Sequence, residues 1–292
     1  MKKYLVVAGC SYTANSGSWA SPEYWDENFK QINLAISGTG NHVISTRVIE
    51  EVDNLLNSGV KPRQLDVIIQ WTGLYRLDTV VPKRDDVPRS ISSLPMPYKL
   101  KKRKSDNIWV TDASRIDDSI WRDLYRITSD EQFFISTLEN ILRTQWYLKS
   151  KKIKYLMFTG WDIFTYGKKP NKESNQKEIV ISGNQFSDKI YNNINNDLVT
   201  DSYTWSSSLW DMIDWDNFWT FENDKVKYGG MLQWIQNTLP KNWYSGRPGK
   251  KIRDFHPSSE AHKKFANTVL ITAMETLNCR RRYRPSPVKG SR

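Results

Sequence analysis

Residues 3–11 read KYLVVAGCS, and this stretch decides the fold that the sequence predicts. Its first six residues are mostly apolar or β-branched, which is typical of a strand buried on both faces of a parallel sheet. Gly9 ends the strand, and a loop begins at Cys10. The stretch imitates an export signal, but its apolar run is shorter than the roughly 7 to 15 residues that such a signal uses. We therefore interpret residues 3–8 as the first strand of an α/β fold.

Strands and helices then alternate along the chain. Expected strands cover residues 31–36, 66–70 and 154–159, and expected helices cover about 41–58, 130–150 and 257–277. Asn41 is a candidate N-cap of the first of these helices, and Gly59 and Pro62 follow its end. A strand, a helix and a strand in succession predict a parallel sheet covered by helices.

The chain is expected to form one domain, residues 1–278, followed by a basic tail at residues 279–292. Two stretches without this periodicity, about 74–129 and 160–245, are interpreted as insertions. Of the net charge of +11, the tail contributes +6 and the rest of the chain +5. Four more basic residues are consecutive at 101–104. Such short clusters favour solvated segments, with a weak, salt-sensitive contact to nucleic acid or another polyanion through the tail as a secondary expectation.

The composition excludes several classes of protein. The 292 residues are 38% hydrophobic, and no apolar run approaches the roughly 20 residues of a membrane helix. The two cysteines, Cys10 and Cys279, lack the spacing of a zinc site or a disulfide framework. We therefore expect a cytoplasmic protein that binds no metal and contacts no membrane. Its three histidines, His42, His256 and His262, leave few candidates for a general base.

Polar residues follow three expected strands, at residues 9–13, 37–41 and 71–73. The carboxyl ends of parallel strands meet at one edge of a sheet, so these residues are expected to converge. His256 lies just before the last helix and is a candidate base for a serine, which is a poor nucleophile by itself at neutral pH. Ser11, His256 and Asp254 form a candidate triad.

At these residues the sequence resembles the SGNH hydrolase family, also called GDSL-type esterases. Gly9-Cys10-Ser11 stands at the first block of that family, Gly38 at the second, Trp71-Thr72-Gly73 near the third, and Asp254 with His256 at the last. The match follows the family order from residue 3 to about 277 and is most similar to divergent members encoded by bacteriophages. The resemblance implies a three-layer α/β/α sandwich with a central, mostly parallel sheet. A phage-encoded member would lie in the host cytoplasm or in the virion.

The resemblance also implies hydrolysis of an ester without a metal or an organic cofactor. Ser11 attacks the carbonyl, His256 takes the serine proton, and Asp254 orients the imidazole. The backbone amides of Ser11 and Gly38 are expected to face the oxyanion. The expected substrate is an acylated small molecule or a polysaccharide that carries O-acetyl or other acyl groups.

Two departures from the family pattern concern the catalytic groups. The family places an asparagine side chain at the oxyanion from its third block, whereas this chain has Thr72 there, with Asn41 as a substitute by residue type. One lost oxyanion donor costs roughly 3 to 4 kcal/mol of transition-state stabilisation. Whether another group replaces the asparagine therefore distinguishes an active enzyme from an inactive relative. The second departure is the single residue between Asp254 and His256, where the family has two.

The competing hypothesis is a catalytically inactive binding or structural protein on the same fold, such as a phage component. The tryptophan-rich segment from Trp205 to Trp243 fits either core packing or a platform for sugar rings, and less readily base stacking on nucleic acid. Cys10 is expected to be a buried structural thiol. His262 is expected to be a packing or surface residue.

Overall fold

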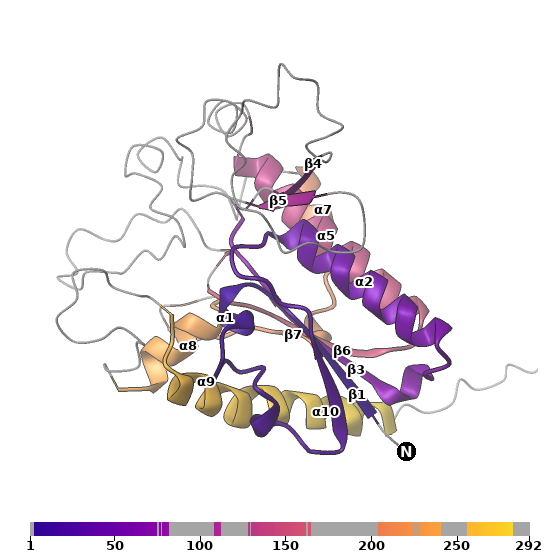
Figure 1. The fold of residues 1–292 in the computed structure, drawn as a ribbon. Helices are drawn as coiled ribbons and strands as arrows, with labels where there is room; N and C mark the ends of the chain where they lie inside the picture. The colour runs from indigo at the N-terminus through magenta and orange to yellow at the C-terminus, as the bar shows by residue number, and fades with distance from the viewer. Residues whose placement is uncertain are drawn as a thin grey trace, which may run out of the picture.

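Five parallel strands form one sheet, in the order β2-β1-β3-β6-β7, in the computed structural model (Figure 1). The structure describes residues 3–74, 76, 78–81, 108–111, 128, 130–161, 163, 164, 204–224, 226, 228–240 and 256–282. The strands are β2 (Phe29–Asn33), β1 (Lys3–Ala8), β3 (Leu65–Trp71), β6 (Lys154–Thr159) and β7 (Phe218–Trp219). The parallel sheet predicted from the alternation of elements is confirmed.

The central strands β1, β3 and β6 are almost entirely buried. Their register aligns Val6 with Val67, and Val67 with Tyr155, so apolar side chains form continuous layers across the sheet. Burial on both faces explains why these strands consist of nearly continuous apolar runs. β2 begins and ends earlier than predicted, although the Leu34 amide beyond its end still donates to the Val7 carbonyl at 2.8 Å.

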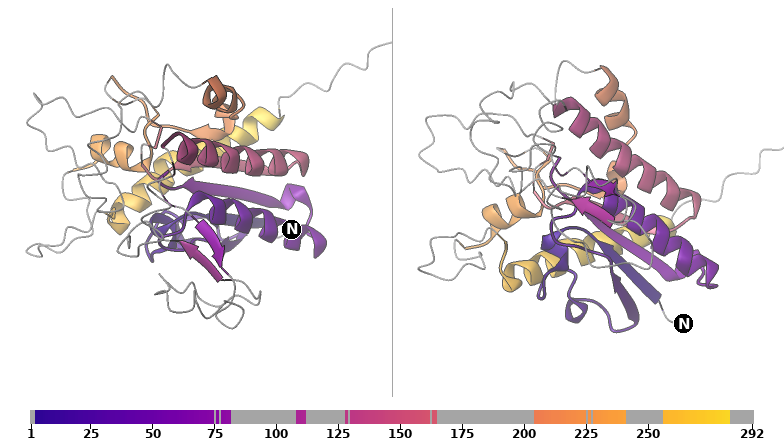
Figure 2. Two further views of the ribbon diagram at one scale, coloured as in Figure 1. Left: turned by 90° about the horizontal axis from the view of Figure 1, so that it is seen from above. Right: turned by 45° about the horizontal axis from the view of Figure 1, so that its top comes forward.

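Helices cover both faces of the sheet (Figures 1 and 2). α2 (Asn41–Asn57) and α5 (Asp130–Ser150) run side by side on one face. The other face is covered by α9 (Ser259–Phe265), the π-helical segment η5 (Ala266–Leu270) and α10 (Ile271–Arg282). This arrangement is consistent with a three-layer α/β/α fold.

The start of α2 differs from the expectation. Its N-cap is Gly40, and the Asn41 side chain does not cap it. Instead, the Asp78 carboxylate accepts hydrogen bonds from the backbone amides of Gly40 and Val43, both at 2.8 Å. Burial raises the pKa of Asp78 to about 6, and these amides offset part of that effect. At the other end of the helix, Gly59 has a φ of 94°, a left-handed conformation that suits glycine after a helix.

Asp78 belongs to a hairpin inside the first expected insertion. β4 (Asp78–Val81) and β5 (Ile108–Thr111) pair antiparallel and form a second sheet of two strands. The sequence predicted no sheet element in this stretch. Through its first residue, the hairpin is attached to the start of α2.

The stretch interpreted as the second insertion contributes a strand to the main sheet. β7 lies inside it and pairs in parallel with β6 at the edge. The same stretch contains α7 (Thr204–Asp211), the 3-10 helix η4 (Trp215–Asn217) and α8 (Met231–Thr238). A strand of two residues is too short to show a period in the sequence.

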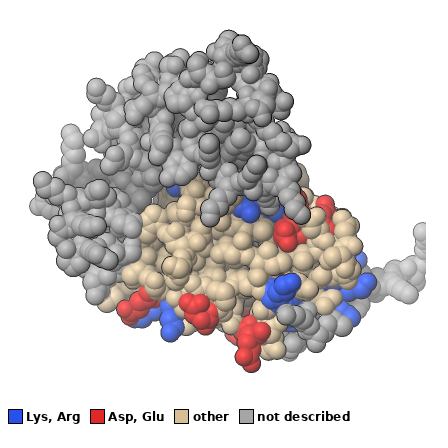
Figure 3. Space-filling model, in the orientation of Figure 1, with Lys and Arg blue, Asp and Glu red and all other residues tan. Residues whose placement is uncertain are grey.

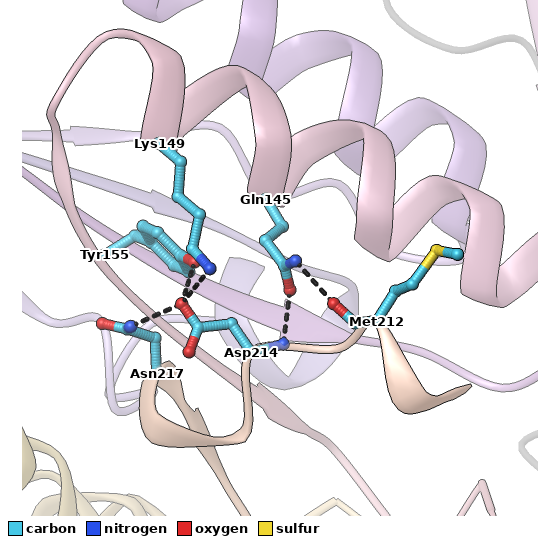
Figure 4. A network of polar contacts seen from close by, with 6 residues as sticks. All are labelled: Gln145, Lys149, Tyr155, Met212, Asp214 and Asn217. Atoms are coloured by element: carbon cyan, nitrogen blue, oxygen red, sulfur yellow. Dashed lines mark hydrogen bonds and ion pairs between the residues drawn. The ribbon is translucent and has the colours of Figure 1, made fainter. Parts of the chain in front are cut away.

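Asp214 fixes the chain just before β7 (Figure 4). Its carboxylate accepts hydrogen bonds from Tyr155 Oη and Asn217 Nδ2, each at 2.8 Å, and pairs with Lys149 Nζ at 2.7 Å. The Asp214 amide donates to Gln145 Oε1 at 2.7 Å. Burial alone raises the pKa of Asp214, but these donors hold it below its ordinary value. The network joins α5, β6 and η4.

The last helix extends further than predicted. α10 continues to Arg282, so the first four residues of the expected tail, 279–282, are helical. The rest of the tail and the basic run at 101–104 lie outside the described residues. Two short 3-10 helices, η1 (Pro22–Tyr24) and η2 (Pro62–Gln64), lead into β2 and β3. Within the described ranges, no helix is both long and apolar enough to span a bilayer.

Candidate active site

Ser11 and His256 lie in contact although 245 residues separate them along the chain. His256 Nε2 is 2.8 Å from Ser11 Oγ, and the imidazole tautomer decides which atom donates. Ser11 is the first residue of α1 (Ser11–Ala14), three residues after the end of β1, and His256 precedes α9. A hydroxyl at this distance from a ring nitrogen can transfer its proton to that nitrogen as it becomes a nucleophile.

Buried polar residues below the serine hold α1 against the sheet. Thr13 Oγ1 donates to Gln70 Oε1 at 2.9 Å and accepts from Trp19 Nε1 at 3.1 Å. Residue 9 must be glycine in this arrangement, because a Cβ atom on Gly9 would lie 2.2 Å from Thr13 Oγ1. Since Gln70 belongs to β3, the turn that carries Ser11 is attached to the centre of the sheet.

The histidine lies between Tyr12 and the start of α9. The ring of Tyr12 packs edge-on against His256, with 5.1 Å between the ring centroids. Two residues further on, Ser258 caps α9 by accepting a hydrogen bond from the Ala261 amide at 3.2 Å. Asp254, the predicted acid of the triad, lies outside the described residues.

Gly38 follows β2 and has a φ of 83°. It is exposed, and no atom lies within 4 Å of the place where its Cβ would be. In the part of the chain that the structure describes, the backbone amides of Ser11 and Gly38 donate no hydrogen bond. Unpaired N–H groups at a helix start and in a loop are the kind of donor that stabilises an oxyanion.

Thr72 and Asn41 pair with each other. The Thr72 amide donates to Asn41 Oδ1 at 2.9 Å, and Asn41 Nδ2 donates to the Thr72 carbonyl and to Thr137 Oγ1, each at 3.1 Å. Both N–H groups of the Asn41 amide are therefore in use. The Thr72 side chain is fully buried, and its hydroxyl has no partner at hydrogen-bond distance among the described residues, although it lies near the Cys10 thiol. In this arrangement both residues join β3 to α2 and α5, and neither presents a free donor to a substrate.

Cys10 and His262 are buried next to the site. Burial raises the pKa of the Cys10 thiol, but the charge of Arg76 and hydrogen bonds, including one from Gln70, bring it below its ordinary value. His262 is only 4% exposed, and its Nδ1 has no hydrogen-bond partner among the described residues. Burial, and secondarily the charge of His256, lowers the pKa of His262 to about 3. His262 is therefore a neutral packing residue.

The described tryptophans of the segment 205–243 pack within the fold. They are Trp210, Trp215, Trp219 and Trp234. The rings of Trp210 and Trp215 lie 4.6 Å apart. Trp219 and Trp234 contact Phe265 of α9 at 5.2 and 5.5 Å. Core packing therefore accounts for these four, whereas the side chain of Trp205 and the whole of Trp243 lie outside the described residues.

Sequence reasoning missed Arg76, which follows the end of β3. Its Cζ lies 5.4 Å from the ring centroid of Trp161, and its Nη1 donates to the Thr39 carbonyl at 3.2 Å. A single arginine in a stretch without periodicity forms no sequence pattern that would predict a site residue. Its position three residues after Gly73, at a predicted strand end, was the one available signal.

No metal centre is formed by the described residues, in which no three His, Cys, Asp or Glu side chains gather as ligands. Neither a scan against protein-family models nor a search of the curated proteins finds a match to this chain.

Proposed function

We propose that the chain is a serine ester hydrolase of the SGNH type, with Ser11 as the nucleophile and His256 as the general base. The observation that carries this proposal is the 2.8 Å distance between Ser11 Oγ and His256 Nε2. The position of Ser11 supports it, because reactive groups of parallel α/β sheets gather at the carboxyl ends of the strands. β1, which ends just before Ser11, lies within an all-parallel sheet.

The proposed reaction has two halves. Ser11 Oγ bonds to the ester carbonyl carbon while His256 Nε2 takes the hydroxyl proton. The bond to the alcohol oxygen then breaks, and His256 returns the proton to the leaving alkoxide. In the second half, water attacks the acyl-enzyme, the same imidazole takes the proton of the water, and Ser11 is regenerated as the carboxylic acid leaves. Asp254 is proposed to orient the imidazole through its other ring nitrogen.

The backbone amides of Ser11 and Gly38 are the proposed oxyanion donors. Neither donates a hydrogen bond elsewhere in the described part of the chain. Thr72 and Asn41, which the sequence suggested as oxyanion donors, have a positioning role in this proposal. They hold the ends of β3 and α2 together, so that their contribution to catalysis is to position the loops.

An acylated small molecule or polysaccharide remains the proposed substrate. The four described tryptophans of the segment 205–243 favour core packing over a sugar platform, because they pack within the fold. Contact with a polyanion is proposed only through the basic tail. Figure 3 shows acidic and basic side chains intermixed along the lower rim of the described surface on that face.

Labelling with a fluorophosphonate, followed by intact-mass measurement, tests the proposal. We expect one adduct on the native protein, none on Ser11→Ala, and slow labelling of His256→Gln. Ser16→Ala is the matched control, because Ser16 is an exposed serine in the loop that follows α1. Turnover of p-nitrophenyl acetate by the native protein and by Ser16→Ala, but not by Ser11→Ala, is expected in the same samples.

The rival function is a catalytically inactive binding or structural protein on this fold. It predicts that the folded native protein takes up no adduct and releases no p-nitrophenol. Labelling of the native protein and Ser11→Ala to the same extent would also count against Ser11 as the nucleophile.

A further inference from the structure

Arg76 places a positive charge near the loops that follow β1, β2 and β6. Its guanidinium lies over the ring of Trp161, which follows β6, and the ring of Trp161 packs edge-on against Tyr12 with 5.4 Å between centroids. Tyr12 in turn contacts His256 and directly follows Ser11. A continuous series of ring contacts therefore connects the guanidinium to the proposed base.

A second contact places Arg76 next to the proposed oxyanion loop. Arg76 Nη1 donates to the carbonyl of Thr39, the residue after Gly38. The guanidinium is also close enough to Cys10, the residue before Ser11, to favour the thiolate form of its buried side chain. Loops that follow β1, β2 and β6 thus all lie near this one side chain.

Most hydrogen-bonding capacity of Arg76 is unused in the described part of the chain. A guanidinium has five N–H donors, and the one side-chain hydrogen bond that Arg76 makes there is to Thr39. Arg76 is half-buried, and none of its nitrogens is among the buried atoms that lack a partner. The charge of Arg76 acts on the Asp78 carboxylate, whose oxygens already accept hydrogen bonds from the backbone amides of Gly40 and Val43.

Arg143 shows how the same molecule uses an arginine to hold helices together. Its nitrogens donate to Ser45 Oγ, to the His42 carbonyl, to Thr46 Oγ1 and to Asn140 Oδ1, at 3.0 to 3.4 Å. Three of those four bonds join α5 to α2, and the fourth, to Asn140, lies within α5. Arg76, with a single such bond, has donors left for a ligand.

We propose that Arg76 binds an anionic group of the substrate, so that the preferred ester carries a carboxylate close to the scissile bond. This inference rests on the proposed esterase function and names the class of ester. The planar guanidinium matches the two oxygens of a carboxylate. The Trp161 ring below it restricts the orientation of the guanidinium before a substrate arrives.

Paired esters test this inference. One pair carries the charge on the acyl side, p-nitrophenyl hemiglutarate against p-nitrophenyl pentanoate, and the other carries it on the alcohol side, acetoxybenzoate against acetoxytoluene. In at least one pair we expect kcat/KM of the native protein to favour the anionic ester. Arg76→Gln is expected to lower that preference about ten- to a hundredfold, the range of a hydrogen bond to a charged group, while turnover of the neutral ester is kept. Arg76→Lys should keep part of the preference, and Arg143→Gln should keep all of it.

Three outcomes would overturn the inference. The native protein shows no preference in either pair, Arg76→Gln leaves the preference unchanged, or Arg76→Gln lowers turnover of both members of a pair equally. The last result would assign Arg76 to holding the Thr39 loop.

A binding measurement separates this inference from the proposed activity. Calorimetric titration of Ser11→Ala with acetoxybenzoate is expected to show binding that is lost in the double variant with Arg76→Gln, whether or not the native protein turns over any ester. If the native protein hydrolyses nothing but this binding is seen, the esterase proposal fails and the anion site stands. If turnover occurs but neither binding nor preference depends on Arg76, the esterase proposal stands and the anion site fails.

Discussion

Gly17 lies so close to Ser259 that a Cβ atom on residue 17 would be 2.3 Å from Ser259 Oγ. Gly17 belongs to the loop after α1, and Ser259 is the first residue of α9. Besides the contacts of Ser11 and Tyr12 with His256, this is a further place where the two segments meet. The backbone there also has a φ of 72°, which favours glycine.

We expect Gly17→Ala to separate the two segments and to lower kcat/KM at least tenfold, because the added methyl group must displace α9 or the loop. Gly59→Ala is the matched control. Gly59 has a φ of 94°, but no atom lies within 4 Å of its Cβ position, so this variant has the backbone strain without the clash. Rates of p-nitrophenyl acetate hydrolysis and urea denaturation curves measure the two effects. An equal loss of activity in both variants would contradict the role of the Gly17 contact.

Thr72→Val tests whether the Thr72 hydroxyl serves the oxyanion. Because this hydroxyl is fully buried without a partner in the described chain, we expect the isosteric valine to leave kcat within a few-fold of the native value and to keep or raise the free energy of unfolding. A lost oxyanion donor would instead lower kcat about a hundred- to a thousandfold. Thr13→Val is the control, since the Thr13 hydroxyl bonds both Gln70 and Trp19 and its loss should destabilise the fold.

His262 should make the protein less stable as the pH falls. Its pKa is about 3 in the folded chain, against an ordinary 6.5. Between these values the unfolded chain binds a proton that the folded chain does not, so the free energy of unfolding falls with decreasing pH by up to about 1.4 kcal/mol per pH unit from this residue. His262→Leu should flatten the pH dependence of urea denaturation in this window. An unchanged slope would show that His262 is protonated in the folded protein.

Asp214 should affect the free energy of unfolding at lower pH than His262 does. Its pKa lies below the ordinary 3.8 in the folded chain, so its stabilising effect is complete at neutral pH and is lost as the pH falls below about that value. We expect Asp214→Asn to lower the free energy of unfolding by about 1 to 3 kcal/mol at neutral pH, the cost of leaving its donors poorly paired. The difference from the native protein should shrink in strong acid. Asp224→Asn, which removes an exposed carboxylate, should change the denaturation midpoint little at either pH.

Local pattern was sufficient to predict two elements whose apolar pattern is continuous. The strand at residues 154–159 and the helix at residues 130–150 were predicted with the observed bounds, because their periods run uninterrupted. The cap of α2 was not predictable in this way. Asp78, which accepts its first amides, lies 38 residues after Gly40, and no local rule connects them.

In the site, too, some features could be predicted from local sequence and others depend on long-range contacts. Residue type and position offered Ser11, from the turn after the first strand, and His256, from just before the last helix, as a candidate pair, and the two side chains lie in contact. The hydrogen bonds of Asn41 were decided by long-range contacts, since its partner Thr72 directly follows β3 and its partner Thr137 belongs to α5. A chemically suitable side chain does not reveal whether the fold has already occupied its donors. β7 was missed for a different reason, since its two residues are recruited to the sheet by tertiary contacts.

The separation of 245 residues between Ser11 and His256 also bears on how the protein is made. Synthesis delivers the serine early, and the strand that precedes it can pair with β2 and β3 while most of the polypeptide has yet to leave the ribosome. The imidazole emerges only with the residues that introduce α9. A nascent chain therefore holds an unactivated serine for most of its translation. Competence to cleave an ester would arise in one late step, when the final helices dock on the completed sheet.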